Sequence, residues 1–252
     1  MTARGLSASV IIAAAGQGRR FAAGDRAEPS APTKVFALLA GRPILAHTLD
    51  RFAALAEVAE AIVAVPPDLV TWAAETFGST LGPAADASAR PRRLAFVAGG
   101  DDRTASVARA LEATDPATDL VAIHDAARPL IRPAVVREAL RVAAECGAAV
   151  VGRPIDHTIK NVPDGRRVER TIPRQGLWIA QTPQVFRRDV IARAYAAREQ
   201  AGPHITDDAQ LVEALGLPVT MVPGDAANFK ITTPEDLRLC EALLAAGWPF
   251  ED

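Results

Sequence analysis

Cysteine and aromatic residues are scarce in this chain of 252 residues, which contains two Cys, three Trp and one Tyr. Two cysteines cannot build a framework of several disulfides, and the apolar pattern around each of them predicts a helix. We therefore expect Cys146 and Cys240 to be buried free thiols rather than a disulfide or a metal site. This usage fits a protein of the reducing cytoplasm.

Long apolar runs and an excess of one charge are absent as well. No run reaches the roughly 18 apolar residues that a membrane-spanning helix requires, and the first nine residues lack the pattern of an export signal. Lys and Arg number 28, and Asp and Glu number 30, which gives a net charge of −2. These features predict a chain with no membrane segment and no face for nucleic acid.

The chain does contain a regular alternation of strand-like and helix-like patterns. Strands are expected from Val10 and at 35–39, 61–65, 94–98, 120–123, 148–151, 219–222 and 228–231. Helices are expected at 44–52, 68–77, 103–113, 133–146, 189–200, from 206 and at 234–246. This order predicts a mainly parallel sheet with helices on both faces, whose ligands bind at the carboxyl ends of the strands. The length fits one large α/β domain over 1–252.

The stretch from Val10 to Arg20 has the pattern of an apolar strand that runs into a loop of small residues and ends in two arginines. Backbone N–H groups at Gly16, Gly18 and the neighbouring alanines can approach anionic oxygens closely because these residues have little or no side chain. Arg19 and Arg20 would add positive charge there. The loop is therefore a candidate phosphate cradle. The alternative is a tight turn after an edge strand with two solvated arginines.

The spacing of this loop excludes two common nucleotide-binding motifs. A dinucleotide fingerprint needs a third glycine three residues after Gly18, where Phe21 stands, and the phosphate loop of nucleoside triphosphatases needs a Gly-Lys-Ser/Thr ending. The polar segment 22–33 should be a mobile loop beside the cradle, and it ends at Lys34.

An acidic residue, Asp125, follows the strand expected at 120–123. At the carboxyl end of a strand and beside small residues, a carboxylate is well placed to hold Mg²⁺ or to accept a hydrogen bond from a sugar hydroxyl. The alternative is a helix cap that also forms a surface ion pair with Arg128.

Two alternating segments, 158–162 and 167–171, flank Asp164-Gly165, which is a hairpin signal. A two-stranded arm is marginally stable by itself. We therefore expect this arm to pack on another subunit, although an ordinary surface hairpin remains an alternative. Trp178, which follows the arm, is expected in the core, and the alternative is a stacking platform for a ligand.

Seven motifs occur in order along nearly the whole chain. They are Ala-Ala-Ala-Gly-Gln-Gly-Arg-Arg (13–20), Lys34, Gly-Gly-Asp-Asp-Arg (99–103) with Ser106, His-Asp-Ala-Ala-Arg-Pro (124–129), Leu-Trp-Ile-Ala-Gln-Thr-Pro-Gln (177–184), Thr-Asp-Asp-Ala (206–209) and Asn-Phe-Lys-Ile-Thr-Thr-Pro-Glu-Asp-Leu (228–237). Together they resemble the 2-C-methyl-D-erythritol 4-phosphate cytidylyltransferase family. The resemblance implies a Rossmann-like nucleotidyltransferase fold, the use of CTP and Mg²⁺, and a homodimer locked by β-arms, here at about 154–176.

The reaction that the resemblance implies is in-line attack of the acceptor phosphate on the α-phosphorus of CTP, with pyrophosphate leaving. Both reactants are anions, so the resemblance assigns catalysis to cations: Arg20 and Lys34 on the triphosphate, and Lys230 at the α-phosphate and acceptor phosphate. It places the nucleotide against Ala14, Ala15, Gly16, Gly18, Gly100, Asp101 and Ser106. For Ser106, the alternative is an ordinary helix residue.

The resemblance also implies an acceptor site for the sugar-alcohol phosphate. It assigns Asp125, Thr182, Thr206 and Asp207 to the acceptor, with Thr158, Lys160 and Arg174 reaching from the arm into the partner subunit's site. The alternative for the arm cations is solvated surface charge. Asp125 is also the candidate metal ligand, unless Mg²⁺ is held through the CTP phosphates alone.

The chain departs from the family pattern at two points. Thr33-Lys34-Val35 stands where the family often has Pro-Lys-Gln, and Ala227 precedes Asn228 where relatives tend to carry a polar residue. Two other functions stay open: a sister cytidylyltransferase acting on ribitol 5-phosphate, and a nucleotide-binding protein without phosphate chemistry. Lys34 and Lys230, both beside expected sheet ends, favour the transferase. The length predicts one catalytic domain without a fused second enzyme.

Overall fold

A computed structural model describes residues 5–16, 33–78, 93–202 and 205–248 of the chain. The central sheet has seven strands in the order β11-β7-β10-β6-β1-β4-β5. Their bounds are β1 Ala8–Ala13, β4 Val58–Val65, β5 Arg93–Ala98, β6 Leu120–Asp125, β7 Ala148–Pro154, β10 Trp178–Arg187 and β11 Thr220–Pro223. Of the neighbouring pairs in this described sheet, only those that β10 makes with β6 and β7 are antiparallel. The expected mainly parallel sheet is confirmed.

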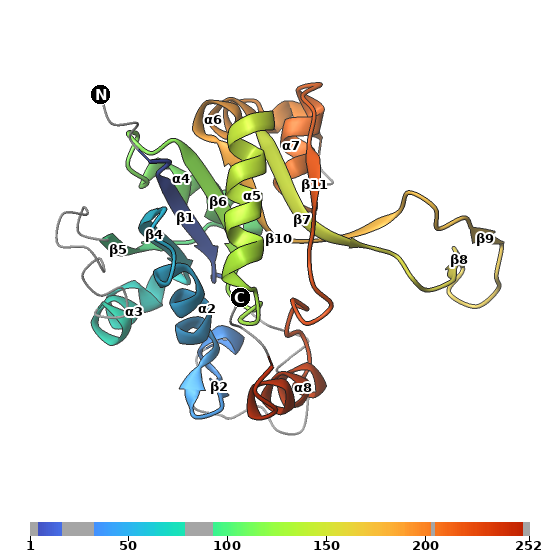
Figure 1. The fold of residues 1–252 in the computed structure, drawn as a ribbon, viewed down its shortest axis with the longest axis horizontal. Coiled ribbons are helices and arrows are strands. Elements are labelled where there is room, and N and C mark those ends of the chain that lie inside the picture. The colour runs from blue at the N-terminus through green and yellow to red at the C-terminus, as the bar shows by residue number, and fades with distance from the viewer. Residues whose placement is uncertain (1–4, 17–32, 79–92, 203–204, 249–252) are drawn as a thin grey trace.

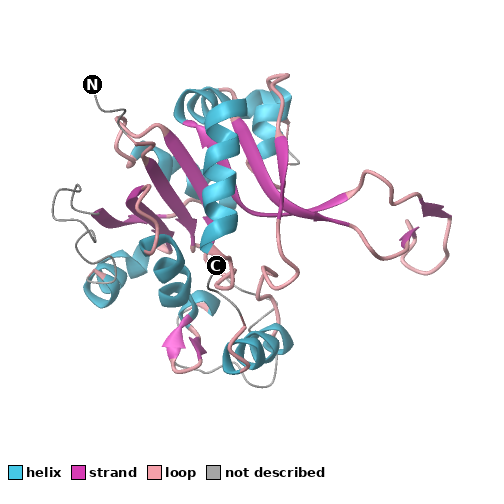
Figure 2. Cartoon of the chain, in the orientation of Figure 1, coloured by secondary structure: helices cyan, strands magenta, loops and turns pink. Residues whose placement is uncertain are grey.

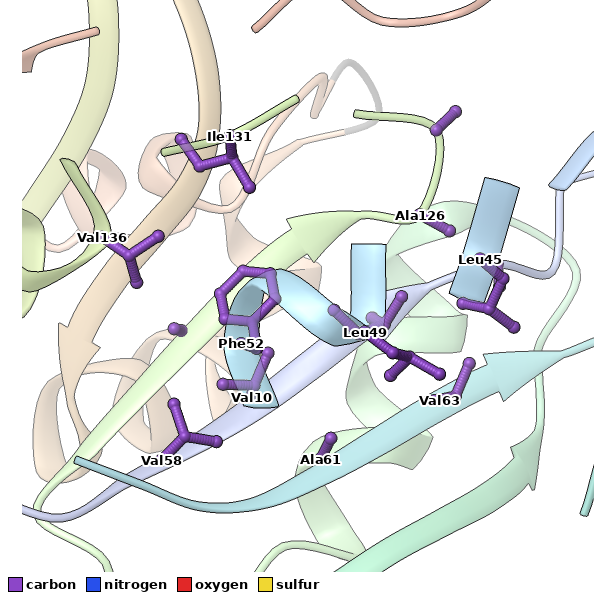
Figure 3. Close-up of a cluster of buried hydrophobic side chains, with 14 of the residues drawn as sticks. Val10, Leu45, Leu49, Phe52, Val58, Ala61, Val63, Ala126, Ile131 and Val136 are labelled. Atoms are coloured by element: carbon purple, nitrogen blue, oxygen red, sulfur yellow. The ribbon is translucent and has the colours of Figure 1, made fainter. Parts of the chain in front are cut away.

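The central strands are buried on both faces, which explains why their sequences are almost continuously apolar. In β1, Val10 and Ile12 belong to one hydrophobic core and Ile11 to the other, as the two-residue period of a strand requires. Phe52, which is fully buried, packs over this sheet from helix α2 Ile44–Ala53 (Figure 3). Burial of one such ring contributes about 1.5–3 kcal/mol to stability.

Helices cover both faces of the sheet (Figures 1 and 2). On the side of Val10 lie α2 Ile44–Ala53, α3 Val70–Phe77, α5 Pro133–Cys146 and α8 Pro234–Ala245. On the side of Ile11 lie α4 Arg103–Glu112, α6 Arg188–Ala196 and α7 Ala209–Ala214. Short 3-10 turns are η1 Lys34–Phe36, η2 Pro67–Leu69 and η3 Arg198–Ala201. The helical cover on both faces that the alternation predicts is confirmed.

Helix α5, Pro133–Cys146, has the bounds that the sequence predicted. It starts at Pro133, which needs no N–H partner at the first helical position, and ends before Gly147, whose φ of +94° suits glycine. The start of α8 also follows its sequence signal. The Thr233 hydroxyl accepts from the Asp236 N–H at 3.2 Å, and the Asp236 carboxylate accepts from the Thr233 N–H at 2.8 Å.

The predicted hairpin forms from β8 Ile159–Asn161 and β9 Arg170–Ile172, which pair antiparallel. Asp164 accepts hydrogen bonds from the backbone N–H groups of Arg166 and Arg167 at 2.9 and 2.8 Å, which closes the turn. Figure 1 shows this arm projecting from the body beyond the ends of β7 and β10. Its role in a dimer remains a prediction.

Two strand assignments from the sequence are wrong. Residues 35–39 were expected as one strand, but η1 comes first and only β2 Leu38–Leu39 is extended, paired with β3 Arg42–Pro43. Residues 228–231 have no strand pairing, because their polar groups bond elsewhere. The Asn228 side-chain amide donates to the Thr182 carbonyl at 2.9 Å, and the Ile231 N–H donates to the Ala127 carbonyl.

One strand and two side chains also differ from expectation. No strand was expected at 178–187, although β10 is the longest strand of the described sheet. Trp178 is not in the core but 36% exposed, because β10 begins where the chain returns from the arm. Cys146 is exposed at the end of α5, whereas Cys240 is buried as expected. None of the described helices is both long and apolar enough to span a lipid bilayer.

Candidate active site

The carboxyl ends of four strands meet at one edge of the sheet. Ala13 at the end of β1 is in register with Asp125 of β6 and Ala64 of β4, and Val65 is in register with Ala98 of β5. A cavity of about 890 Å³ opens there. Its lining consists of Ala13, Ala15, Gly16, Pro66, Pro67, Asp68, Gly99, Gly100, Asp101, Asp102, Arg103, Ser106, Arg109, Asp125 and Lys230. We call this cavity the edge pocket.

The edge pocket gathers seven of the residues expected from the sequence: Ala15, Gly16, Gly100, Asp101, Ser106, Asp125 and Lys230. Ala14 is buried beneath it, and its N–H donates to the Ala64 carbonyl at 2.8 Å. Ala14 therefore fixes the first loop to the sheet, whereas Ala15 and Gly16 face the cavity. Gly18, Arg20 and residues 22–32 of the expected mobile loop lie outside the described residues, and only its last residue, Thr33, is described.

The turn after β5 is built around two glycines that have no room for a side chain. A Cβ at Gly99 would stand 2.3 Å from the Cβ of Ala15, and one at Gly100 would stand 2.5 Å from the Cβ of Ala105. Ser106 closes the same turn: its hydroxyl accepts from the Gly100 N–H at 3.0 Å and donates to the Asp102 carbonyl at 2.7 Å. Ser106 is thus buried support for the loop as well as part of the pocket wall.

Asp125 is the electrostatic centre of the pocket. Its carboxylate is contacted by Lys230 Nζ at 3.1 Å, Arg128 Nε at 3.2 Å and Arg103 Nε at 3.4 Å. Burial alone would raise the pKa of Asp125, but these three cations together hold that pKa well below its usual range. The ion pair with Arg128 that the sequence allowed is therefore present, but it is buried rather than on the surface.

His124, beside Asp125, is neutral in this setting. Its Nε2 donates to the Arg128 carbonyl at 3.1 Å, so its Nδ1 is left to accept from the Thr182 hydroxyl at 3.1 Å. Burial lowers the pKa of His124 to about 4. The Thr182 hydroxyl also accepts from the Asp125 N–H at 3.0 Å. Thr182 therefore connects β10 to the end of β6.

Lys34 and Lys230 are brought to the same segment of backbone. Lys34 Nζ donates to the carbonyl of Ile231 at 2.6 Å, one residue after Lys230. The Lys230 side chain is 38% exposed and lies in the wall of the edge pocket, whereas Lys34 is not among the lining residues. The two lysines that the sequence singled out are thus joined through one short stretch, 230–231.

Two further residues that the resemblance assigns to the acceptor substrate, Thr206 and Asp207, lie just before α7. The Asp207 carboxylate accepts from the Gln184 side-chain amide at 2.8 Å and from the Gln210 N–H at 3.1 Å, and Thr206 is exposed. Neither lines the edge pocket. Thr158 and Arg174 are also exposed, and they belong to the projecting arm (Figure 1). Within one chain, the fold therefore does not bring the arm residues to the pocket.

Sequence reasoning missed two cations in the pocket wall, Arg103 and Arg109. Arg103 stood inside the quoted Gly-Gly-Asp-Asp-Arg motif but received no role. Arg109 donates to the Gly99 carbonyl at 2.6 Å and so braces the turn of glycines from the side of α4. Arg109 gives no signal in the sequence by itself, because its side chain meets the turn only once the helix has formed and packed on the sheet.

The side chains of the pocket determine how it could bind a metal ion. Within the described residues, no group of three or more His, Cys, Asp or Glu is arranged to hold one. Mg²⁺ usually keeps several waters and takes one or two carboxylates together with substrate phosphates. Asp125 offers one carboxylate to an ion that a nucleotide's phosphates carry, and its oxygens contact three cationic side chains in this structure.

A mostly parallel sheet whose carboxyl edge holds a loop of small residues, a turn of glycines and a set of cations is suited to bind a nucleotide, and the comparisons below identify its class as an α/β nucleotidyltransferase. The sequence model of one such family, described as IspD: 2-C-methyl-D-erythritol 4-phosphate cytidylyltransferase, matches residues 8–246. The chain belongs to this family, as its seven motifs indicated.

Individual relatives agree with the family match. A 2-C-methyl-D-erythritol 4-phosphate cytidylyltransferase from Solibacter usitatus is 40% identical over 242 residues, covering 95% of this chain and 96% of that protein. One from Acidobacterium capsulatum is 44% identical over 237 residues, covering 91% and 94%. The crystal structure of the Thermus thermophilus enzyme of this name is 36% identical, with a TM-score of 0.73, and covers 95% of this chain and 100% of that chain.

Proposed function

We propose that the edge pocket is where this chain joins CTP and 2-C-methyl-D-erythritol 4-phosphate, giving 4-diphosphocytidyl-2-C-methyl-D-erythritol and pyrophosphate. The observation that carries the proposal is the convergence of family motifs from 13–16, 99–106, Asp125 and Lys230 on one cavity of about 890 Å³. A cavity of this size is typical of small-molecule sites. The whole reaction would take place in a single domain, 1–252.

The nucleotide would lie along the side formed by β1, β5 and α4. The backbone at Ala15 and Gly16 faces the pocket without side chains that would keep phosphate oxygens away. Gly100 and Asp101, held by Ser106, would meet the cytosine and ribose. Arg20 and Gly18 are proposed to complete the triphosphate site from the segment outside the described residues.

The acceptor would lie between Asp125 and the start of α7. Asp125 would accept from a hydroxyl of the acceptor, and Thr206 and Asp207 would contact its other polar groups. Thr182 would act beside them by fixing the Asp125 backbone, since its hydroxyl accepts from the Asp125 N–H. Thr158 and Arg174 would reach this site from the partner subunit of a homodimer, because the arm that carries them projects away from the body of its own chain (Figure 1).

Catalysis would rest on positioning and on cations rather than on a protein nucleophile. The acceptor phosphate would attack the α-phosphorus in line with the departing pyrophosphate, and negative charge would build on the phosphoryl oxygens. Lys230 can turn from Asp125 toward those oxygens, because its side chain is partly exposed in the pocket wall. Lys34 would neutralise the leaving group. Mg²⁺, when bound through the nucleotide with Asp125 as a ligand, would offset charge on the phosphates.

Pyrophosphate release tests this function. The protein is incubated with CTP and Mg²⁺, and in parallel with either 2-C-methyl-D-erythritol 4-phosphate or D-ribitol 5-phosphate. Release with the methylerythritol phosphate alone is expected. Release with ribitol phosphate alone would overturn the acceptor assignment while leaving the nucleotide chemistry intact, and release with neither would favour a nucleotide-binding protein without catalysis.

A further inference from the structure

Arg103 joins two carboxylates that lie in different parts of the fold. Its Nε is 3.4 Å from Asp125 Oδ1 at the end of β6, and its Nη2 is 2.7 Å from Asp208 Oδ2 at the start of α7. Arg103 lines the edge pocket, whereas Asp208 does not and its side chain is only 1% exposed. A guanidinium can span two acceptors in this way because its donors point in fixed, separate directions.

Asp208 is itself held from two sides. Tyr195 of α6 donates its hydroxyl to Asp208 Oδ1 at 2.5 Å. The Asp208 and Ala209 N–H groups both donate to the Gln184 side-chain oxygen at 3.0 Å, which fixes the first turn of α7 to β10. The carboxylate that receives Arg103 is therefore immobilised by α6, α7 and β10 together.

Arg103 lies closer to Asp208 than to Asp125. The ion pair with Asp208 is 2.7 Å long, whereas the contact with Asp125, which has hydrogen-bond geometry, is 3.4 Å long. Burial alone would lower the pKa of Arg103, but Asp208 and then Asp125 raise it, so the guanidinium stays charged. The contact with Asp208 thus keeps the charged Arg103 guanidinium near Asp125 but prevents it from approaching that carboxylate more closely.

Resting on the function proposed above, we propose that Asp208 and Tyr195 are positioning residues that set Arg103 and thereby keep Asp125 accessible to the acceptor. Neither touches the substrates. When Asp208 is neutral, Arg103 has one carboxylate partner left and moves onto Asp125, where it competes with the acceptor hydroxyl. The effect falls on acceptor binding, because the turn at 99–102 that faces the nucleotide is held separately by Ser106 and Arg109.

The test compares Asp208→Asn with Glu60→Gln. Glu60 is a matched control: it is 2% exposed and paired with an arginine, Arg93, at 3.1 Å, but it stands near the amino end of β4, away from the pocket. For Asp208→Asn the KM for the acceptor is expected to rise about tenfold, because the close ion pair that positions Arg103 is lost. The KM for CTP is expected to stay within about twofold of the wild type, since no contact to the turn is lost.

Two further variants guard against misfolding. Tyr195→Phe removes one hydroxyl from a buried ring and is expected to raise the acceptor KM in the same direction by a smaller factor. Arg103→Lys keeps the positive charge but cannot contact both carboxylates at once, so the acceptor KM is expected to change in this variant as well. Glu60→Gln is expected to lower the melting temperature and to leave both KM values unchanged, because KM does not depend on the folded fraction.

An unchanged acceptor KM in Asp208→Asn and Tyr195→Phe would overturn the inference, since Asp208 would then be structural in the same sense as Glu60. A wild-type protein without activity would refute the proposed function instead. In that case crystal structures of Asp208→Asn and Glu60→Gln decide: an Arg103 Nε closer to Asp125 than 3.4 Å in the first alone supports the positioning role, and an unmoved guanidinium refutes it.

Discussion

Lys34 Nζ donates to the backbone carbonyl of Ile231 at 2.6 Å, so a residue near the start of the chain is bonded to one near its end. The next residue back, Lys230, contacts Asp125 at 3.1 Å. The segment 230–231 therefore connects both proposed catalytic lysines to the acidic centre of the edge pocket. Its position is fixed on the other side by the Ile231 N–H, which donates to the Ala127 carbonyl at 2.9 Å.

Lys230→Ala is expected to lower kcat by roughly 10²- to 10³-fold, the usual cost of one preorganised cation or donor at a developing charge. Lys34→Ala is expected to lower it comparably and also to destabilise the fold, because the bond to Ile231 is lost. Steady-state pyrophosphate release measures the first effect and thermal melting the second. Arg238→Ala, an exposed cation on α8 paired with Glu235, is the control and should leave kcat unchanged.

Gly100→Ala and Gly16→Ala are expected to act differently. A Cβ at Gly100 meets Ala105 at 2.5 Å, so the turn must shift and the protein loses about 1–3 kcal/mol of stability. A Cβ at Gly16 meets no atom of the described residues within 4 Å, so the melting temperature of this variant should stay unchanged while the KM for CTP rises, because the methyl group occupies phosphate space.

Gly5→Ala is the control for both, since a Cβ there also meets no described atom within 4 Å and Gly5 is not in the pocket wall. Melting curves and the KM for CTP are measured for all three. A Gly16→Ala protein with the wild-type KM for CTP would remove this residue from the phosphate cradle.

Mixed dimers test whether the arm serves the neighbouring subunit. Arg174→Ala and Lys34→Ala are each expected to be nearly inactive alone. When equal amounts are unfolded and refolded together, roughly a quarter of the wild-type activity should return, since half the dimers are mixed and each has one intact site. No recovery, with dimers present by size-exclusion chromatography, would show that Arg174 serves its own subunit.

The two cysteines are expected to differ in reactivity. Cys146 is exposed, whereas Cys240 is buried and its burial raises the pKa of the thiol to about 12. Since the thiolate is the reactive form, a thiol reagent at a pH of about 8 should label Cys146 alone in the native protein and both residues after denaturation. Cys146→Ser should abolish native labelling. Rapid native labelling of Cys240 would contradict its place in the core.

Local signals in the sequence determined much of this protein. The bounds of α5, the capping box at Thr233 and the Asp164-Gly165 turn follow from short-range propensities that hold in any surroundings. The two-sided burial of β1 follows from its continuous apolar run. The family motifs also placed seven residues in the wall of one pocket before any fold was known, because small residues and charges after successive strands meet at the same edge of a parallel sheet.

Long-range contacts decided the rest. Trp178 is exposed because β10 is inserted antiparallel between β6 and β7 and begins out along the arm, and no local pattern records a strand's neighbours. Residues 228–231 look like a strand, but the Asn228 amide bonds across to Thr182 instead of joining a ladder. Arg103 and Asp208 meet only when α4 and α7 pack on the same face of the sheet. Such pairings depend on which segments share a surface, and that is fixed by the packing of the whole chain rather than by the residues beside each one.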